Sequence, residues 1–202
     1  MARYTAAKNK LARKVGQDLG LKSQPLKVAR RLNIHPGVHG RKMRRKQSEY
    51  GRQLMEKQKV RFTYGVQEKY LRNLFVVAEK TPLATGAALM KLLERRLDNV
   101  VFRLGFAPTR AAARQLVAHG HVMVNGKKLD IPSYRVKVGD TVSLKDHTAK
   151  IPYIAALLES KNVSVPKWLS RQATVGQVSA LPERDDITEG IDDQLVVEYY
   201  SR

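Results

Sequence analysis

Cysteine is missing from this 202-residue chain, and its absence removes several kinds of site at once. Without thiols there is no disulfide and no thiolate ligand for zinc. Long apolar runs are missing too, because segments such as IPYIAALL fall far short of the roughly 20 residues that a membrane-spanning helix needs. The first residues also lack the continuous apolar stretch of a secretory signal. We therefore expect a soluble intracellular protein.

Acidic residues are scarce, with 18 Asp and Glu against 38 Lys and Arg, which gives a net charge of +20. Residues 1–60 hold 17 of the basic and only 3 of the acidic side chains. A basic arm on a more neutral body indicates nucleic acid or another anionic surface as partner. A membrane surface is disfavoured because the arm has no sustained amphipathic stripe. A merely solvated charge run is the other alternative.

Apolar periodicity and turn residues predict the helices. Residues 1–47 form a basic arm broken by Pro and Gly. Helices are predicted over 49–64, where Ser48 is the N-cap, and over 67–80. A third, continuous helix is predicted over 86–104, with a wide apolar stripe.

Further along, the spacing of apolar residues changes from the helical period of 3.6 residues to the strand period of 2. A short helix is predicted to start at Thr109, and the sequence HVMVNG reads as a strand entering a type I′ turn at Asn125-Gly126. Two short strands follow around Gly139-Asp140, with Val136 and Val138 pointing inward. Further on, we predict a helix over 151–160 and a terminal strand over 194–200.

These elements predict an α+β fold in which a small αα-ββ module is inserted into a mainly helical lobe. The predicted divisions are a basic arm over 1–47, a helical lobe over 48–87 that is completed by 145–202, and the module over 88–144.

Catalytic and metal sites are poorly supported. His35 and His39 are four residues apart, but Pro36 and Gly37 disfavour a helix there and no further ligand follows. The sequence RRLD is similar to the tripeptide around the catalytic Asp of pseudouridine synthases, yet Asp98 is better explained as a helix-surface acid paired with a neighbouring Arg. We find no nucleophile elbow, phosphate-binding Gly loop or Ser/His/Asp set.

The basic residues around the short helix make a stronger case. Arg110 and Arg114 share one face, the Ala-rich face allows close approach to a nucleic-acid backbone, and the hairpin tip brings Lys127 and Lys128 to the adjoining edge. We therefore predict one continuous basic surface for phosphate. If so, reversing both arginine charges would weaken RNA binding and leave the thermal melt nearly unchanged.

Residues 92–140, which include PTRAAARQLVAHGHVMVNGKK, resemble the RNA-binding module of small-subunit ribosomal protein four. Some tRNA synthetases, pseudouridine synthases and a heat-shock protein share this module, which is also called the alpha-L type. The flanks, with HPGVHGRKMRRKQSEYGRQLMEKQKVRFTYGV before the module and LPERDD and VVEYYSR after it, are similar to the bacterial ribosomal family itself.

The resemblance implies a non-enzymatic, cytoplasmic ribosomal protein without a cofactor, a small-molecule substrate or a membrane. It implies binding to a multi-helix junction in the 5′ domain of small-subunit ribosomal RNA, nucleation of assembly and an influence on translational accuracy. It also implies contact with small-subunit ribosomal protein five, near the path by which messenger RNA enters. Many family members hold zinc with four N-terminal cysteines, so this cysteine-free chain is expected to use no metal.

The candidate RNA-binding residues come from the module and from the arm with its following helix. They are Arg110, Arg114, Gln115, His119, Lys127 and Lys128, together with Arg41, Arg44, Arg45, Lys46, Tyr50, Lys57, Lys59 and Arg61. Two other functions stay open on the residues alone, an RNA-modifying enzyme that carries the same module and a general basic chaperone for nucleic acids.

Overall fold

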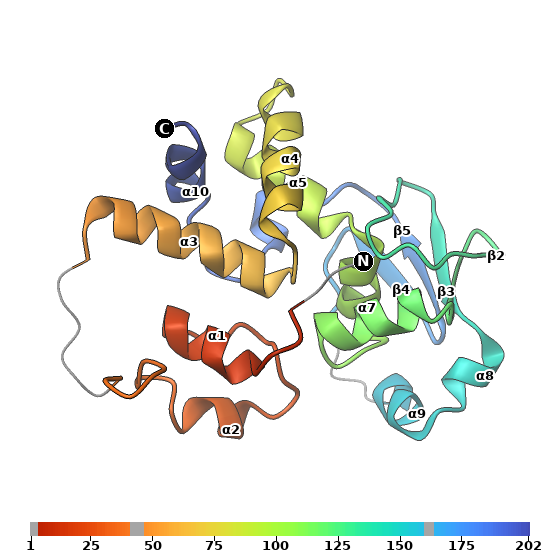
Figure 1. Cartoon of the computed structure of the whole chain (residues 1–202). Coiled ribbons are helices and arrows are strands. Elements are labelled where there is room, and N and C mark those ends of the chain that lie inside the picture. The colour runs from red at the N-terminus through yellow and green to blue at the C-terminus, as the bar shows by residue number, and fades with distance from the viewer. Residues whose placement is uncertain (1–3, 41–46, 160–163) are drawn as a thin grey trace. The chain divides into compact units, whose positions relative to one another are not determined.

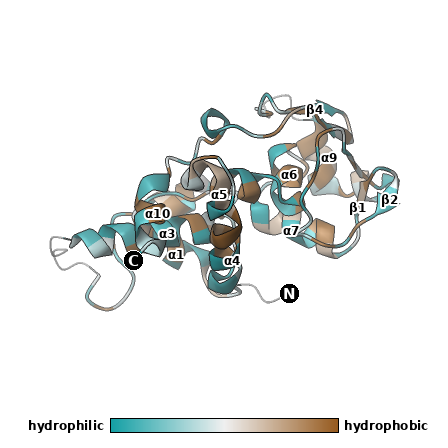
Figure 2. Cartoon of the chain, turned by 90° about the horizontal axis from the view of Figure 1, so that it is seen from above, coloured by the Kyte–Doolittle hydropathy of each residue, from teal (hydrophilic) through white to brown (hydrophobic). Residues whose placement is uncertain are grey.

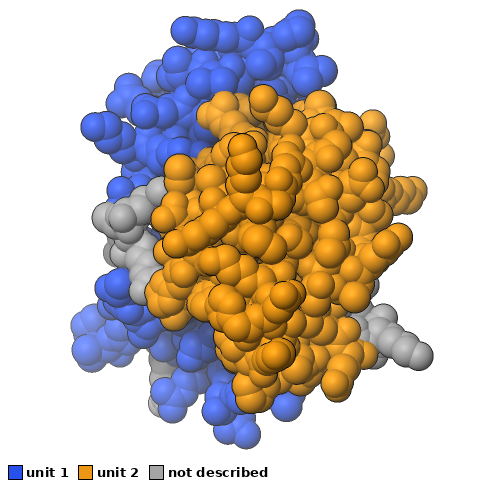
Figure 3. Space-filling view, turned by 90° about the vertical axis from the view of Figure 1, so that its right-hand side faces the viewer, with its two compact units in different colours: residues 1–89, 189–202 blue, residues 90–188 orange. Residues whose placement is uncertain are grey.

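A computed structural model of the chain describes residues 4–40, 47–159 and 164–202 (Figure 1). The chain forms two compact units, coloured separately in Figure 3, the first made of residues 1–89 and 189–202 and the second of residues 90–188. The first unit contains α1 (Lys8–Val15), α2 (Pro25–Ala29), α3 (Glu49–Thr63), α4 (Glu68–Glu79) and α10 (Asp193–Tyr200). Helix α5 (Thr85–Glu94) runs across the boundary in sequence between the two.

The second unit combines helices with one sheet, and this confirms the predicted α+β class. Its helices are α6 (Leu97–Arg103), α7 (Arg110–Ala118), α8 (Asp146–Ala149), α9 (Pro152–Glu159) and the 3₁₀ turn η1 (Arg184–Asp186). Its strands are β1 (Val122–Val124), β2 (Lys127–Lys128), β3 (Thr141–Leu144), β4 (Leu169–Gln172) and β5 (Val175–Val178). The strands pair antiparallel in the order β2-β1-β3-β5-β4.

Helix α3 is the long element of the first unit. The Oγ of Ser48 accepts a hydrogen bond from the Gly51 amide at 3.2 Å, so the predicted N-cap is confirmed. Helix α10 lies against α3, as Figure 1 shows. Side-chain hydrogen bonds join α10 to two other helices. Gln53 of α3 donates to Glu198 at 2.9 Å, and the Tyr200 hydroxyl donates to Glu68 of α4 at 2.9 Å.

The strand predicted over 194–200 is wrong, because this segment is helix α10. The carboxylate of Asp192 accepts hydrogen bonds from the amides of Gln194 and Leu195 at 3.1 and 3.3 Å and so caps the first turn. The valines and tyrosines favour a strand by propensity, but the cap and the packing against α3 decide in favour of a helix.

The continuous helix predicted over 86–104 is also wrong, because the chain breaks at Arg95 and Arg96 between α5 and α6. Arg96 is extended, with φ −68° and ψ 136°, and forms an isolated antiparallel bridge with Arg135. The amides of Leu97 and Val136 donate to Tyr134 and Arg95 at 2.8 and 2.9 Å. Strand-like bonds to a distant segment therefore replace the helical bonds.

The Arg96 guanidinium makes a two-pronged pair with the Asp98 carboxylate, with N–O distances of 3.0 and 2.6 Å. Both side chains are almost fully buried, so the predicted Arg–Asp pairing is confirmed but the predicted surface location of Asp98 is wrong. Burial raises the pKa of Asp98, while Arg96, Arg114 and the Asn99 amide act to lower it. A charged side chain buried in an apolar interior is strongly destabilising unless an oppositely charged group is paired with it.

The β1–β2 hairpin has the predicted turn, since Asn125 and Gly126 both have positive φ, 50° and 76°. The Asn125 side chain donates to Asp140 at 2.8 Å and accepts from the Thr141 amide at 2.9 Å. The turn is therefore fixed to the start of β3 as well as to its own strands.

An apolar core fills the second unit between the helices and the sheet. Its fully buried side chains include Leu97, Val100, Leu104, Phe106, Val117, Val122, Val136, Val142, Ile154 and Trp168. Figure 2 shows α9 as largely hydrophobic. Val136 is buried as predicted, whereas Val138 is 53% exposed because the chain turns at Gly139, where φ is +89°.

The pairing of β5 with β3 also bears on the division of the chain. It places residues 145–188 in the same unit as the module, whereas the sequence prediction assigned them to the helical lobe. Among the described residues, no helix combines the length and the apolar character needed to cross a membrane.

Replacing Arg96 by Met leaves the buried Asp98 carboxylate without its main partner. We expect the free energy of unfolding to fall by about 3–5 kcal/mol, because an unpaired buried charge is strongly destabilising. Urea denaturation followed by circular dichroism measures the change. Arg52→Met is the control, since it ends an exposed ion pair with Glu49 worth about 1 kcal/mol or less. Equal effects of the two substitutions would contradict the structural role of the buried pair.

Candidate nucleic-acid interface

Helix α7 is the centre of the predicted RNA-binding surface. The Thr109 hydroxyl accepts a hydrogen bond from the Ala112 amide at 3.2 Å, so Thr109, the predicted start of the short helix, is its N-cap. Ala113, Leu116 and Val117 are buried in the core of the second unit. The core thus fixes the position of the helix and the direction of its polar face.

Arg110 does not lie on an open surface. It is only 9% exposed, its Nε donates to the Asn99 Oδ1 at 2.7 Å, and its guanidinium lies 4.6 Å from the centre of the Phe102 ring. Arg114 is likewise mostly covered and lies 4.0 Å from the Asp98 carboxylate. The prediction that charge reversal of both arginines would leave the melt unchanged is therefore inconsistent with their packing.

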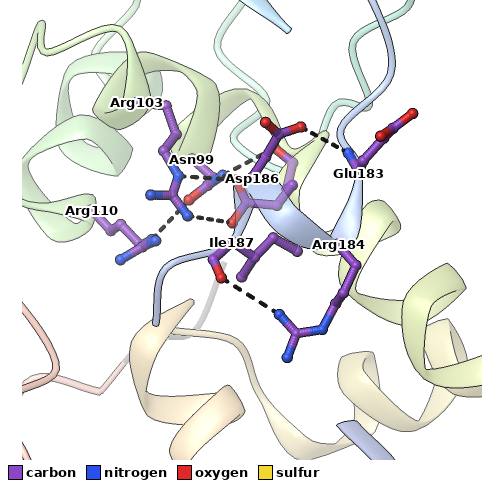
Figure 4. Close-up of polar contacts among 8 residues, drawn as sticks. Asn99, Arg103, Arg110, Glu183, Arg184, Asp186 and Ile187 are labelled. Carbon is purple, nitrogen blue, oxygen red and sulfur yellow. Dashed lines mark hydrogen bonds and ion pairs between the residues drawn. The ribbon is translucent and has the colours of Figure 1, made fainter. Parts of the chain in front are cut away.

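A buried polar network connects Arg110 to the helices before it (Figure 4). Glu94 is 1% exposed and accepts two hydrogen bonds from Arg103, at 3.0 and 2.9 Å, and one from the Asn99 amide group at 2.8 Å. Asn99 in turn accepts from Arg110. The chain of contacts Arg103–Glu94–Asn99–Arg110 holds the end of α5, α6 and the start of α7 together.

Sequence reasoning missed this network. The available signal was a set of charged and amide residues, Glu94, Asn99 and Arg103, placed within an otherwise apolar helical pattern. Such residues are buried only when they are paired, so their position itself indicates internal partners. Near them, Glu183 and Asp186 cap η1 reciprocally, and Arg184 donates to the Ile187 carbonyl at 3.5 Å (Figure 4).

The remaining candidates of the module lie in the second half of α7, at its C-cap and on β2. Gln115 and His119 are exposed on the helix, and Lys127 and Lys128 are exposed on β2. The Lys128 stem crosses Gly120, where φ is +71° and an added Cβ would collide with the lysine Cε. The structure thus brings Lys128 beside the C-terminal end of α7, not beside the two arginines of its first turns. We call these four exposed residues the basic edge.

In the first unit, Tyr50 is 49% exposed, and its ring centre lies 5.9 Å from that of Tyr199. Hydrogen bonding with Tyr199 is the main cause that raises the pKa of Tyr50. The Arg202 guanidinium lies 5.8 Å from the Tyr50 ring. Aromatic and cationic groups therefore adjoin at the start of α3, a combination suited to stacking on RNA bases.

The lysines predicted on α3 are buried. Lys57 forms a 2.9 Å ion pair with Glu68 and lies 4.6 Å from the centre of the Tyr199 ring. Lys59 donates to the Gly190 carbonyl at 2.6 Å. Arg61 is half-buried and donates to Gln58 at 3.1 Å.

These contacts join α3 to α4 and to the C-terminal segment, and RNA contact by these three residues stays a prediction. The predicted residues Arg41, Arg44, Arg45 and Lys46 lie outside the described part of the chain.

No group of three or more metal-ligating side chains occurs in residues 4–40, 47–159 and 164–202. His35 is half-buried, with its Nδ1 3.1 Å from the Pro36 carbonyl, and His39 is exposed. Asp98, the acid considered for catalysis, is enclosed by Arg96 and Arg114. The described side chains around α7 form a polar and basic surface over the apolar core of the second unit.

Comparison with known families agrees with this geometry. Residues 95–142 match the family described as S4 domain, and residues 3–94 match the Ribosomal protein S4/S9 N-terminal domain. The second unit therefore contains an S4 RNA-binding domain, and the residues before this domain match the N-terminal domain of a family of ribosomal proteins.

Full-length relatives make the assignment specific. The chain is 47% identical to the small ribosomal subunit protein uS4 of Roseiflexus castenholzii and 51% identical to that of Herpetosiphon aurantiacus, over 100% of each chain. It is 50% identical to that of Methylobacillus flagellatus, over 100% of this chain and 98% of the other. The chain belongs to the family of small ribosomal subunit protein uS4. These relatives are ribosomal proteins and not enzymes, which argues against the RNA-modifying alternative.

Replacing Arg110 by Gln tests whether this side chain supports the fold. We expect the free energy of unfolding to fall by about 2–3 kcal/mol, since a buried charged hydrogen bond and a cation–π contact are lost. Lys127→Gln, on the exposed strand β2, should change stability by less than about 0.5 kcal/mol. Chemical denaturation of both variants gives the comparison. An unchanged melt of Arg110→Gln with weakened RNA binding would show instead that Arg110 faces the RNA.

Proposed function

We propose that the chain is a structural component of the cytoplasmic ribosome that binds small-subunit ribosomal RNA directly. The observation that carries this proposal is the similarity to uS4 proteins along the full length of the chain. The proposed target is a multi-helix junction in the 5′ domain. By holding several RNA helices together, the protein would nucleate assembly of the subunit and contribute to translational accuracy.

The charge and the fold support this proposal. A net charge of +20 attracts the phosphate array of RNA at long range. The basic edge then offers lysine and histidine at short range, on a helix and a hairpin held by one core. Because RNA helices are recognised mainly by shape and backbone contacts, a rigid cationic surface suits such a target.

The first unit supplies a second part of the proposed surface. Tyr50 with Arg202 suits base stacking, and the basic residues Arg41, Arg44, Arg45 and Lys46 precede α3 in the sequence. Small-subunit ribosomal protein five and messenger RNA near its point of entry are the further partners we propose.

Removing the lysine charges of the basic edge tests the proposal. Lys127→Gln with Lys128→Gln should weaken binding to a 5′-domain RNA transcript and lower the slope of log affinity against log salt by about 1–2. Filter binding between 50 and 200 mM salt measures both. The control is Lys69→Gln with Lys80→Gln on and beside α4, where both lysines are exposed and the charge change is the same. Identical losses in the two variants would show a general charge effect and contradict a specific edge.

A further inference from the structure

Three of the chain's five histidines come together where α7 ends. His119 is the C-cap of α7, His121 follows Gly120, and His147 lies in α8. The ring centres of His119 and His121 are 6.2 Å apart, and those of His121 and His147 are 5.4 Å apart. We call these three residues the histidine cluster.

The surroundings of the histidine cluster are mainly cationic. The Lys128 side chain reaches over Gly120 from β2, and the Lys145 amide donates to the His121 carbonyl at 3.1 Å. The acid next to His147 in the sequence, Asp146, is exposed in the first turn of α8. Such a concentration of donors and positive charge suits an anion with several oxygen atoms.

His121 is held in one orientation. Its Nδ1 lies 3.0 Å from the hydroxyl oxygen of Thr148, whose side chain is fully buried. The ring is half-buried, whereas His119 and His147 are exposed. With Nδ1 engaged, Nε2 is the ring atom that can donate to an external acceptor, and the protonated ring carries a hydrogen on Nε2 whichever group donates in the contact with Thr148.

The free protein disfavours that protonated form. Burial lowers the pKa of His121 below its usual 6.5, and His147, His119 and Lys145 lower it further by charge repulsion. A bound anion would raise the pKa of His121, because it attracts the imidazolium and neutralises the neighbouring cations. Binding of the anion and uptake of a proton are therefore coupled.

We propose that the histidine cluster, with Lys128 and Lys145, is a proton-dependent binding site for a backbone phosphate of RNA. This site rests on the proposed function, since it is part of the same RNA-facing edge. It adds a feature that lysine alone cannot supply, a contact whose strength changes within the pH range where histidine titrates.

The direction of the pH effect follows from the coupling. Because the pKa is low in the free protein and higher with phosphate bound, affinity is at its baseline well above the bound-state pKa. It rises as the pH falls through that pKa and levels off below the free pKa. For one coupled proton, the increase is at most about tenfold for each pH unit of difference between the two pKa values.

The test measures binding of the full chain to a 5′-domain RNA transcript at pH 8, 7 and 6 and constant salt. We expect the affinity of the unchanged protein to rise about three- to tenfold from pH 8 to pH 6. His121→Gln with His147→Gln should show less than about a twofold rise over the same pH range.

His35→Gln with His39→Gln is the matched control, because it removes two histidines from the first unit. This control should keep the full response to pH. An NMR titration of the His121 ring provides an independent readout, since RNA should raise its pKa.

Two results would overturn the site: a full pH response in the His121 and His147 variant, or an equal loss of affinity at every pH. Absence of RNA binding by the unchanged protein at every pH would contradict the proposed function itself.

Discussion

The buried pair of Arg96 and Asp98 is the interaction from which the second unit is built. Two charged groups are kept in an apolar interior only when they satisfy each other, and here the guanidinium and the carboxylate do so through two short bonds. Their meeting requires the chain to leave the helical path after α5. The extended link then pairs with the segment around Tyr134, and α6 begins in a new direction.

Further polar contacts extend from this point into α7. In the interior, hydrogen bonds connect Glu94 to Asn99 and Asn99 to Arg110. On β2, Lys127 and Lys128 are exposed. Around α7 the chain therefore employs basic residues in two ways: Arg103 and Arg110 stiffen the support, and Lys127 and Lys128 are exposed to solvent. Because the helix is already held in place, little backbone ordering is left to oppose binding.

Local chemistry explains what could be predicted from the sequence. The cap at Ser48 and the turn at Asn125-Gly126 depend on bonds within a few residues, and both are present. The break at Arg96 could not be seen in the same way, because residues 86–104 follow a helical pattern and the competing bonds come from around residue 134.

The candidate site shows the same division between local and distant information. Exposure of Lys127 and Lys128 at a hairpin tip follows from the turn alone. The burial of Arg110 depends on Asn99 and Phe102, which belong to another helix, and that of Lys57 on Glu68 and Tyr199. A basic residue in a sequence therefore gives its charge but not its partner.

The first unit is assembled from two separated parts of the chain, and this has a consequence for the order of folding. On a growing chain, residues 90–188 are made before α10, so the second unit has all its strands while α3 still lacks the helix that covers it. Lys59 meets the Gly190 carbonyl, and Tyr200 meets Glu68, only after that point. Residues 189–202 thus complete a unit that residues 1–89 began.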